Sequence, residues 1–182
     1  QEEKKWLLVI QHPTPLDPIP LKKQLAPTLR ALQAFDAEVI AIYPNSDTGS
    51  SQFIHAIERL RISGVHVYRS LPRPTFMALL KHAQVLIGNS SAGILEAGYF
   101  KTPVVDIGGR QKGRGRGVNV LHAPYDEYKI RAAIRRALSP AFARIAEKTH
   151  HPYDRGNASK KIVRVLERLK VDEKLLRKEI RV

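Results

Sequence analysis

The sequence predicts an α/β domain, a doubly wound and mostly parallel six-stranded sheet of the Rossmann type. Short runs rich in β-branched residues alternate with longer segments of helical periodicity along most of the chain. The strand candidates are also apolar without interruption, as in Leu7–Ile10 and Val39–Ile42. Such runs are typical of strands that helices cover on both faces. Repeated units of this kind favour the strand order 3-2-1-4-5-6.

The expected elements alternate along the chain and end in a charged segment. Strands are expected at Trp6–Gln11, Glu38–Tyr43, Val65–Arg69, Gln84–Gly88, Pro103–Ile107 and Val118–His122. Helices are expected at Leu21–Phe35, Ser51–Ile62, Pro74–His82, Ala92–Phe100, Glu127–Leu138 and Ser159–Lys170. The last segment, Asp172–Val182, has the pattern of a highly charged amphipathic helix. We therefore predict a Rossmann-like domain over residues 1–170 and a charged helical tail over 171–182.

Length and composition narrow the class of protein. The chain has 182 residues, enough for one domain with a sizeable core. It begins at Gln1 and its single methionine is Met77, so we expect a trimmed chain or a piece of a longer one. There is no signal-peptide pattern and no apolar run long enough to cross a bilayer, so no membrane partner is expected. The absence of cysteine excludes disulfides and thiolate chemistry and fits a cytoplasmic location.

The charge of the chain points to an anionic partner. The formal net charge is +14, which suits nucleic acid, an anionic small molecule or an acidic partner domain. The sequence lacks the interleaved aromatic residues on which single-stranded nucleic acids stack, so nucleic acid is not expected as the partner. No His, Cys or carboxylate spacing typical of a metal site recurs on one face, and we expect neither a metal nor a cofactor.

The segment from Ile87 to Glu96 carries the most functional information. The apolar run Val85–Ile87 predicts a buried strand, and Gly88 allows a sharp turn. Asn89–Ser91 are N-cap residue types, so a helix N-terminus there favours phosphate. Glu96 is expected one and a half turns into the same helix, where the hydroxyls of a ribose would give it hydrogen-bond donors. The simpler alternative is a capped helix with a solvated glutamate.

Three further segments are expected at the same crevice. In the predicted order, strands 1 and 4 are neighbours, and ligands of open α/β sheets bind between their carboxyl ends. His12 follows strand 1 and is held extended by Pro13; an ordinary loop histidine is the alternative. The segment Gly108–Arg116 follows strand 5 and is expected to close over an anion, with Arg110 binding it. A disordered basic loop or a nucleic-acid-binding segment would have the same composition. The segment Tyr43–Asp47 is expected at the flank of the crevice.

Together these motifs resemble the UDP-N-acetylglucosamine 2-epimerase family, in unbroken order from about Trp6 to Lys170. They are most similar to its hydrolysing branch. The resemblance rests on Gln11-His12-Pro13, Tyr43-Pro44-Asn45-Ser46-Asp47, Gly88-Asn89-Ser90-Ser91-Ala92-Gly93 with Glu96, Thr102–Val105, Gly109–Arg114, and Pro152-Tyr153 with Gly156-Asn157-Ala158. It covers only the carboxyl-terminal half of the family's two-domain GT-B fold.

The resemblance implies a set of UDP-binding residues. In it, His12 is the essential histidine near the diphosphate, Asn45 lies along the nucleotide, Leu71 offers backbone groups to the uracil, Ser90 and Ser91 bind phosphate, Glu96 takes the ribose hydroxyls and Arg110 lies beside the diphosphate. For Asn45 and Leu71 these roles go beyond what the residues themselves indicate.

The resemblance also implies an activity and partners. The family's hydrolysing enzymes convert UDP-N-acetylglucosamine and water into N-acetylmannosamine and UDP, for the synthesis of sialic-acid-type sugars. Their acid–base residues lie in the amino-terminal domain. We therefore expect this chain to be the UDP-binding half of such an enzyme, inactive alone, with UDP or a UDP-sugar as ligand. The missing amino-terminal domain would be its partner, and a homo-oligomer is an option for the full-length protein.

Two other functions are left open by the sequence. One half of a GT-B glycosyltransferase would also have a glutamate that binds the ribose and a helix N-terminus that binds phosphate. The joint presence of the motifs Gln11–Pro13 and Arg110–Arg114 argues against this function. A basic nucleic-acid-binding module would bind random oligonucleotides in a salt-dependent way that UDP does not compete. The sugar is also open between N-acetylglucosamine and a 2,4-diacetamido analogue.

Overall fold

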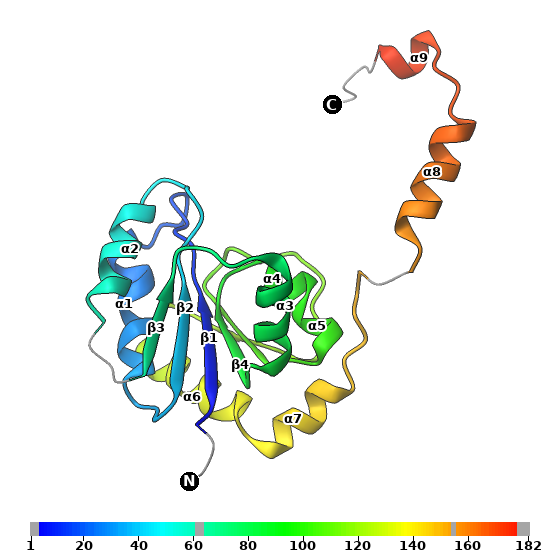
Figure 1. The fold of residues 1–182 in the computed structure, drawn as a ribbon. Coiled ribbons are helices and arrows are strands. Elements are labelled where there is room, and N and C mark those ends of the chain that lie inside the picture. Colours follow the sequence, from blue (N-terminus) through cyan, green and yellow to red (C-terminus); the bar gives the residue numbers. More distant parts are fainter. Residues whose placement is uncertain (1–3, 61–63, 154–155, 178–182) are drawn as a thin grey trace. The chain divides into compact units, whose positions relative to one another are not determined.

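A computed structural model describes residues 4–60, 64–153 and 156–177, and the chain divides into two compact units, residues 1–152 and 153–182. In the first unit, six strands form one sheet in the order β3-β2-β1-β4-β5-β6 (Figure 1). Every neighbouring pair is parallel. The predicted fold class and strand order are therefore confirmed, with a sheet that is wholly rather than mostly parallel.

The strands and helices of this unit follow the predicted alternation. The strands are β1 Trp6–Ile10, β2 Glu38–Ile42, β3 Val65–Tyr68, β4 Val85–Gly88, β5 Val104–Ile107 and β6 Val120–Ala123. The helices are α1 Leu21–Leu32, α2 Ser50–Glu58, α3 Arg73–His82, α4 Ala92–Leu95, α5 Ala97–Phe100, α6 Glu127–Ala137 and α7 Pro140–Glu147. The predicted end of the second helix, at Ile62, lies outside the described residues.

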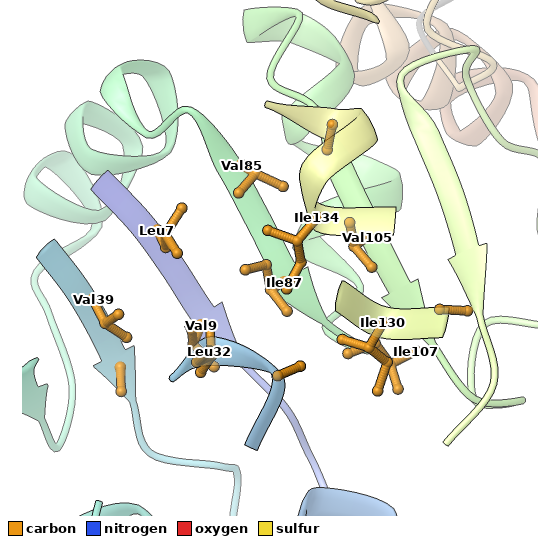
Figure 2. Close-up of a cluster of buried hydrophobic side chains, with 14 of the residues drawn as sticks. Leu7, Val9, Leu32, Val39, Val85, Ile87, Val105, Ile107, Ile130 and Ile134 are labelled. Carbon is orange, nitrogen blue, oxygen red and sulfur yellow. The ribbon is translucent and has the colours of Figure 1, made fainter. Parts of the chain in front are cut away.

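Two apolar clusters cover the two faces of the sheet. Leu7 and Val9 belong to the cluster that Figure 2 shows, where side chains of α1 and α6 pack on the central strands. Leu8 and Ile10 belong to the second cluster, with side chains from α3, α4 and α5. Successive side chains of a strand point to opposite faces, so a strand buried on both faces is apolar at most positions; Asp106 in β5 is a buried exception. This arrangement explains the uninterrupted apolar runs of the sequence.

The carboxyl ends of β1 and β4 are in close contact at Gly88. This residue pairs with Ile10 and has a φ of 131°. A Cβ atom added to it would lie 2.0 Å from the carbonyl oxygen of Ile10. Only glycine fits this conformation and this space. The chain can therefore leave β4 at the point where it touches the end of β1.

The single helix predicted over Ala92–Phe100 is wrong. The chain forms two one-turn helices, α4 and α5, and Glu96 lies between them with a φ of −112°. Gly93 and Gly98 weaken helix propagation on both sides of the break. Gly93 also lies against β5, since an added Cβ would be 2.8 Å from the Val104 side chain. Glu96 is thus displayed at a junction, and a one-turn helix contributes a smaller dipole than the predicted one.

The second unit contains two helices, α8 Ala158–Arg168 and α9 Glu173–Leu176. The helix α9 falls within the predicted tail, and α8 begins one residue before the predicted segment Ser159–Lys170 and ends inside it. Residues 178–182 of the predicted tail lie outside the described residues. No residue of α8 is buried. The boundary at residue 170 stays a prediction. Among the described residues, no helix combines the length and the apolar character that a membrane crossing requires.

We predict that Gly88→Ala lowers the free energy of unfolding by at least about 3 kcal/mol, because the new methyl group collides with the Ile10 carbonyl and the backbone is strained. The matched control is Gly113→Ala, where φ is also positive but no atom lies within 4 Å of the added Cβ. This variant should lose only about 1 kcal/mol. Urea denaturation of both variants provides the measurement. Equal losses would show that the β1–β4 contact does not constrain residue 88.

Candidate functional site

A cavity of about 400 Å³ opens at the carboxyl ends of β1, β2, β3 and β4. Its lining includes most of the residues selected from the sequence: His12, Asn45, Leu71, Ser90, Ser91 and Glu96. Arg110 is not in the lining, but its Nη1 donates to the backbone oxygen of Asn89, 3.1 Å away. The structure thus brings the selected residues together at the predicted switch point. The role of each one in binding stays a prediction.

The imidazole of His12 is held by the loop after β2. The backbone N–H of Asn45 donates to Nδ1 of His12 over 3.0 Å. Burial lowers the pKa of His12 below its ordinary value of 6.5, and the nearby Arg110 cation lowers it further. The Asn45 side chain and the Asp47 carboxylate act in the opposite direction without reversing the shift. The neutral ring is therefore favoured in the folded protein.

Asn89 is the functional position that sequence reasoning missed, because there it counted only as an N-cap residue type. Its side chain accepts from the backbone N–H of His12 over 2.7 Å and donates to the backbone oxygen of His12 over 2.9 Å. Its own backbone oxygen accepts from Arg110 and, over 2.7 Å, from Nε2 of Gln111. The side chain of Asn89 is almost fully buried, with 1% of the residue exposed. Through its side chain and its backbone oxygen, this one buried residue joins the segments that follow β1, β4 and β5.

Two buried glutamines fix the loop that follows β1. Gln11 donates to the backbone oxygen of Gln24 over 2.8 Å and accepts from the Thr28 hydroxyl over 2.7 Å. The side chain of Gln24 accepts from the backbone N–H of Thr14 and donates to the backbone oxygens of Thr14 and Ile19. These bonds satisfy the buried amides, so burying them is not penalised by lost hydrogen bonds. They attach the loop carrying His12 to α1.

The turn between β4 and α4 presents donors to the cavity. Among the described residues, no hydrogen-bond partner is found for the backbone N–H groups of Ser90 and Ser91. The Ser90 hydroxyl accepts from the backbone N–H of Ala92 over 3.3 Å, whereas the Ser91 side chain makes no capping bond. Two free N–H groups at a turn suit an anionic oxygen atom. They supply this property without the long helix that the sequence suggested.

Glu96 offers a free acceptor at the cavity wall. Its side chain is 24% exposed, and its Oε1 atom lies 3.8 Å from Nη1 of Arg73. The Oε2 atom is buried and makes no hydrogen bond within the described residues. A buried carboxylate oxygen without a donor is unfavourable. It is therefore suited to accept hydrogen bonds from hydroxyl groups of a ligand, such as those of a ribose.

The wall near Leu71 contains residues that no sequence pattern indicated. Ile42 and Phe76 add apolar surface, and Arg69 and Ser70 add polar groups at the end of β3. An apolar wall beside polar groups is the usual composition of a small-molecule site. Single polar or aromatic residues after a strand are common in loops, so only their convergence in the fold identifies them.

The glycine- and arginine-rich segment after β5 is anchored at both ends. Gln111 is 1% exposed and bonds to Asn89. At the other end, Nη2 of Arg116 lies 3.0 Å from Oδ2 of Asp106, and Nδ1 of His122 lies 3.6 Å from the same oxygen. Burial raises the pKa of Asp106, and the Arg116 cation opposes this shift. An anchored segment differs from the disordered basic loop considered above.

A larger cavity of about 720 Å³ contains none of the seven predicted UDP-binding residues, but Gly108, Gly109, Lys112 and Arg116 of the segment expected at the crevice line it. It is lined by side chains that follow β1, β5 and β6, among them Asp17, Lys23, Lys112, Arg116 and Tyr125. The hydroxyl of Tyr125 donates to Oδ2 of Asp17 over 3.5 Å. No group of three or more His, Asp or Glu side chains placed to hold a metal ion is found in the described part of the chain.

Comparison with known proteins identifies relatives of the chain. The model of the family described as UDP-N-acetylglucosamine 2-epimerase matches residues 1–167. A UDP-N-acetylglucosamine 2-epimerase of Neisseria meningitidis is 34% identical over 70% of this chain and 34% of the relative. A hydrolysing UDP-N,N'-diacetylbacillosamine 2-epimerase of Legionella pneumophila is 31% identical over 97% of this chain and 46% of the relative. The chain thus spans less than half the length of these relatives.

A solved structure confirms the similarity of the fold. The co-structure of S. aureus MnaA with UDP superposes with a TM-score of 0.71 at 16% identity. The superposition covers 90% of this chain and 44% of the S. aureus chain. At this identity the likeness concerns the fold alone.

We predict that the free energy of unfolding falls as the pH drops below 6.5, in part because of His12. The unfolded histidine binds a proton with a pKa near 6.5, whereas the folded residue binds it only at lower pH. Between these values the unfolded state holds more protons, so acidification favours unfolding. His12→Gln should give a shallower pH dependence in urea denaturation, while His82→Gln, on an exposed part of α3, serves as the matched control. An unchanged slope in His12→Gln would contradict the prediction.

Proposed function

The chain belongs to the UDP-N-acetylglucosamine 2-epimerase family, and we propose that it is the UDP-binding, carboxyl-terminal half of a hydrolysing enzyme of this family. The reaction proposed is the conversion of UDP-N-acetylglucosamine and water into N-acetylmannosamine and UDP. The observation that carries the proposal is the convergence of His12, Asn45, Ser90 and Glu96 on one cavity at the switch point of the sheet. The proposed site of action is the cytoplasm.

The geometry supports a direction for the nucleotide along the cavity. Leu71 and its apolar neighbours after β3 would contact the uracil, and the free carboxylate oxygen of Glu96 would accept from the ribose hydroxyls. The free N–H groups of Ser90 and Ser91 would bind the diphosphate together with Arg110. Asn45 would lie along the nucleotide while its backbone holds His12. The names of the Neisseria and Legionella relatives, which both include a UDP-sugar, support this class of ligand.

The proposed reaction divides its chemical tasks between two halves of the fold. A base removes the proton from C2 of the sugar, the bond from C1 to the diphosphate oxygen breaks, and UDP leaves with the bonding electrons. Water then adds to C1 of the unsaturated sugar, and a proton returns to C2 from the opposite face. The present chain would bind UDP and stabilise the charge that develops on its diphosphate. The base would come from the amino-terminal half.

The choice of the hydrolysing branch is supported by the Legionella relative, whose name includes that activity and whose match extends over 97% of this chain. That relative acts on a diacetamido sugar nucleotide by its name, whereas the Neisseria relative is named for UDP-N-acetylglucosamine. Both sugars therefore stay candidates. A role in making sialic-acid-type sugars is part of the same proposal.

We predict that Glu96→Ala weakens UDP binding about tenfold to a hundredfold, since hydrogen bonds to a charged group contribute about 1.5–3 kcal/mol. Calorimetric titration of the 182-residue chain provides the measurement. Glu147→Ala, an exposed position on α7, is the matched control. The defect should shrink when dUDP replaces UDP, because one of the two hydroxyls is then absent. Loss of folding in Glu96→Ala with no separate binding defect would mark Glu96 as structural.

We also predict the products of a chain that carries both halves of the fold. With UDP-N-acetylglucosamine it should release UDP and free N-acetylmannosamine, which phosphorus NMR and sugar analysis distinguish from UDP-N-acetylmannosamine. Recovery of the epimer still attached to UDP would contradict the hydrolysing assignment. The 182-residue chain alone should show no turnover, because the proposed C2 base is not part of it.

A further inference from the structure

The hydrogen bond at Nδ1 of His12 determines which ring nitrogen carries the proton. A backbone N–H can only donate, so the Asn45 N–H at 3.0 Å requires a lone pair on Nδ1. In the neutral ring the proton must then be on Nε2. Among the described residues, Nε2 makes no hydrogen bond, and His12 lines the cavity. The ring therefore has one free donor, in the wall of the proposed UDP site.

The charges around the ring favour this neutral form. Arg110, after β5, and Asp47, after β2, are the charged groups that act on His12. Arg69 and Glu96 line the same cavity from the end of β3 and from the α4–α5 junction. Burial and the Arg110 cation together keep the pKa of His12 below 6.5. At neutral pH the ring is therefore uncharged. It can donate a hydrogen bond from Nε2 without transferring the proton.

The position of the ring depends on Asn89. The side chain of Asn89 makes two hydrogen bonds to the backbone of His12, of 2.7 Å and 2.9 Å. They fix both the N–H and the C=O group of His12. Because the same residue also accepts from Arg110, it sets the spacing between the imidazole and the guanidinium. Asn89 is nearly fully buried and is not in the lining of the cavity. Asn89 therefore positions His12 and Arg110 and does not itself contact a ligand.

We propose that His12 donates a hydrogen bond from a neutral Nε2–H group to the diphosphate and keeps its proton throughout, and that Asn89 is the residue that positions it. This inference rests on the proposed function. A neutral donor and the Arg110 cation would then stabilise the leaving diphosphate together, since charge grows there as the bond to C1 breaks. In this arrangement His12 supplies no base for C2.

The test is the tautomer of His12 in the ¹⁵N-labelled 182-residue chain, observed by long-range ¹H–¹⁵N NMR at neutral pH. The His12 resonances are assigned by their loss in His12→Gln. We expect a neutral ring protonated at Nε2, and we expect the Nε2–H resonance to shift on addition of UDP but not of uridine, which lacks the diphosphate. A ring protonated at Nδ1, or an imidazolium, overturns the proposal. Binding of UDP without a shift at Nε2 overturns it as well.

The positioning role is tested by Asn89→Ala. We expect a mixture of His12 tautomers and UDP binding weakened on the order of tenfold. The matched control is Asn119→Ala, which removes a buried amide bonded to the backbone oxygen of Thr102 over 2.8 Å. That variant should lose stability while the tautomer and UDP affinity are retained. A single Nε2–H tautomer and normal affinity in Asn89→Ala would exclude the role.

The results of these experiments distinguish a failure of this proposal from a failure of the proposed function. If UDP fails to bind the unmodified chain at all, the proposed function fails, whereas the tautomer of the free protein still decides the geometry. If Asn89→Ala does not fold, Asn89→Asp keeps the shape of the side chain but removes the donor to the His12 carbonyl oxygen, and it is read by the same two measurements.

Discussion

The contact between Gly88 and the carbonyl oxygen of Ile10 is the constraint on which the site depends. It brings the end of β4 against the end of β1 and leaves no space for a side chain. Only with that approach can the side chain of Asn89, the next residue, pair with both backbone groups of His12. The loops after β2 and β5 then bond to His12 and Asn89. The cavity is thus built outward from one backbone contact.

Neutral amides, and not charges, hold the interior of this region together. Gln11, Gln24, Asn89 and Gln111 are each 1% exposed and each bonded to backbone groups. A paired amide loses little on burial, whereas a buried charge loses several kcal/mol unless it is compensated. The buried carboxylate of Asp106 is compensated by Arg116, whose Nη2 atom lies 3.0 Å from its Oδ2 atom. The charged side chains of Arg69 and Glu96, in contrast, line the cavity, where a ligand can meet them.

The fold was predictable from the sequence because it depends on strand patterns. Uninterrupted apolar runs such as Leu7–Ile10 indicate a sheet covered on both faces, and repeated units fix its order. His12 and Glu96 were predictable because they follow strands that meet at the switch point. The break in the helix at Glu96 was not predictable, since it depends on how Gly93 packs against β5. The roles of the buried amides were also not predictable, because glutamine and asparagine in a loop have the same sequence pattern whether they are solvated or buried.

The parallel topology has a consequence for how the chain acquires its structure. The two bonds between Asn89 and His12 join residues 77 positions apart, and β1 obtains its β4 neighbour over a similar separation. Contacts this distant close slowly, because the loop entropy is lost before the contacts form. During synthesis, β1 and β2 emerge before β4 and expose the open edge of β1, a template for pairing with other chains. Completion of the cavity and protection of that edge are therefore the same event.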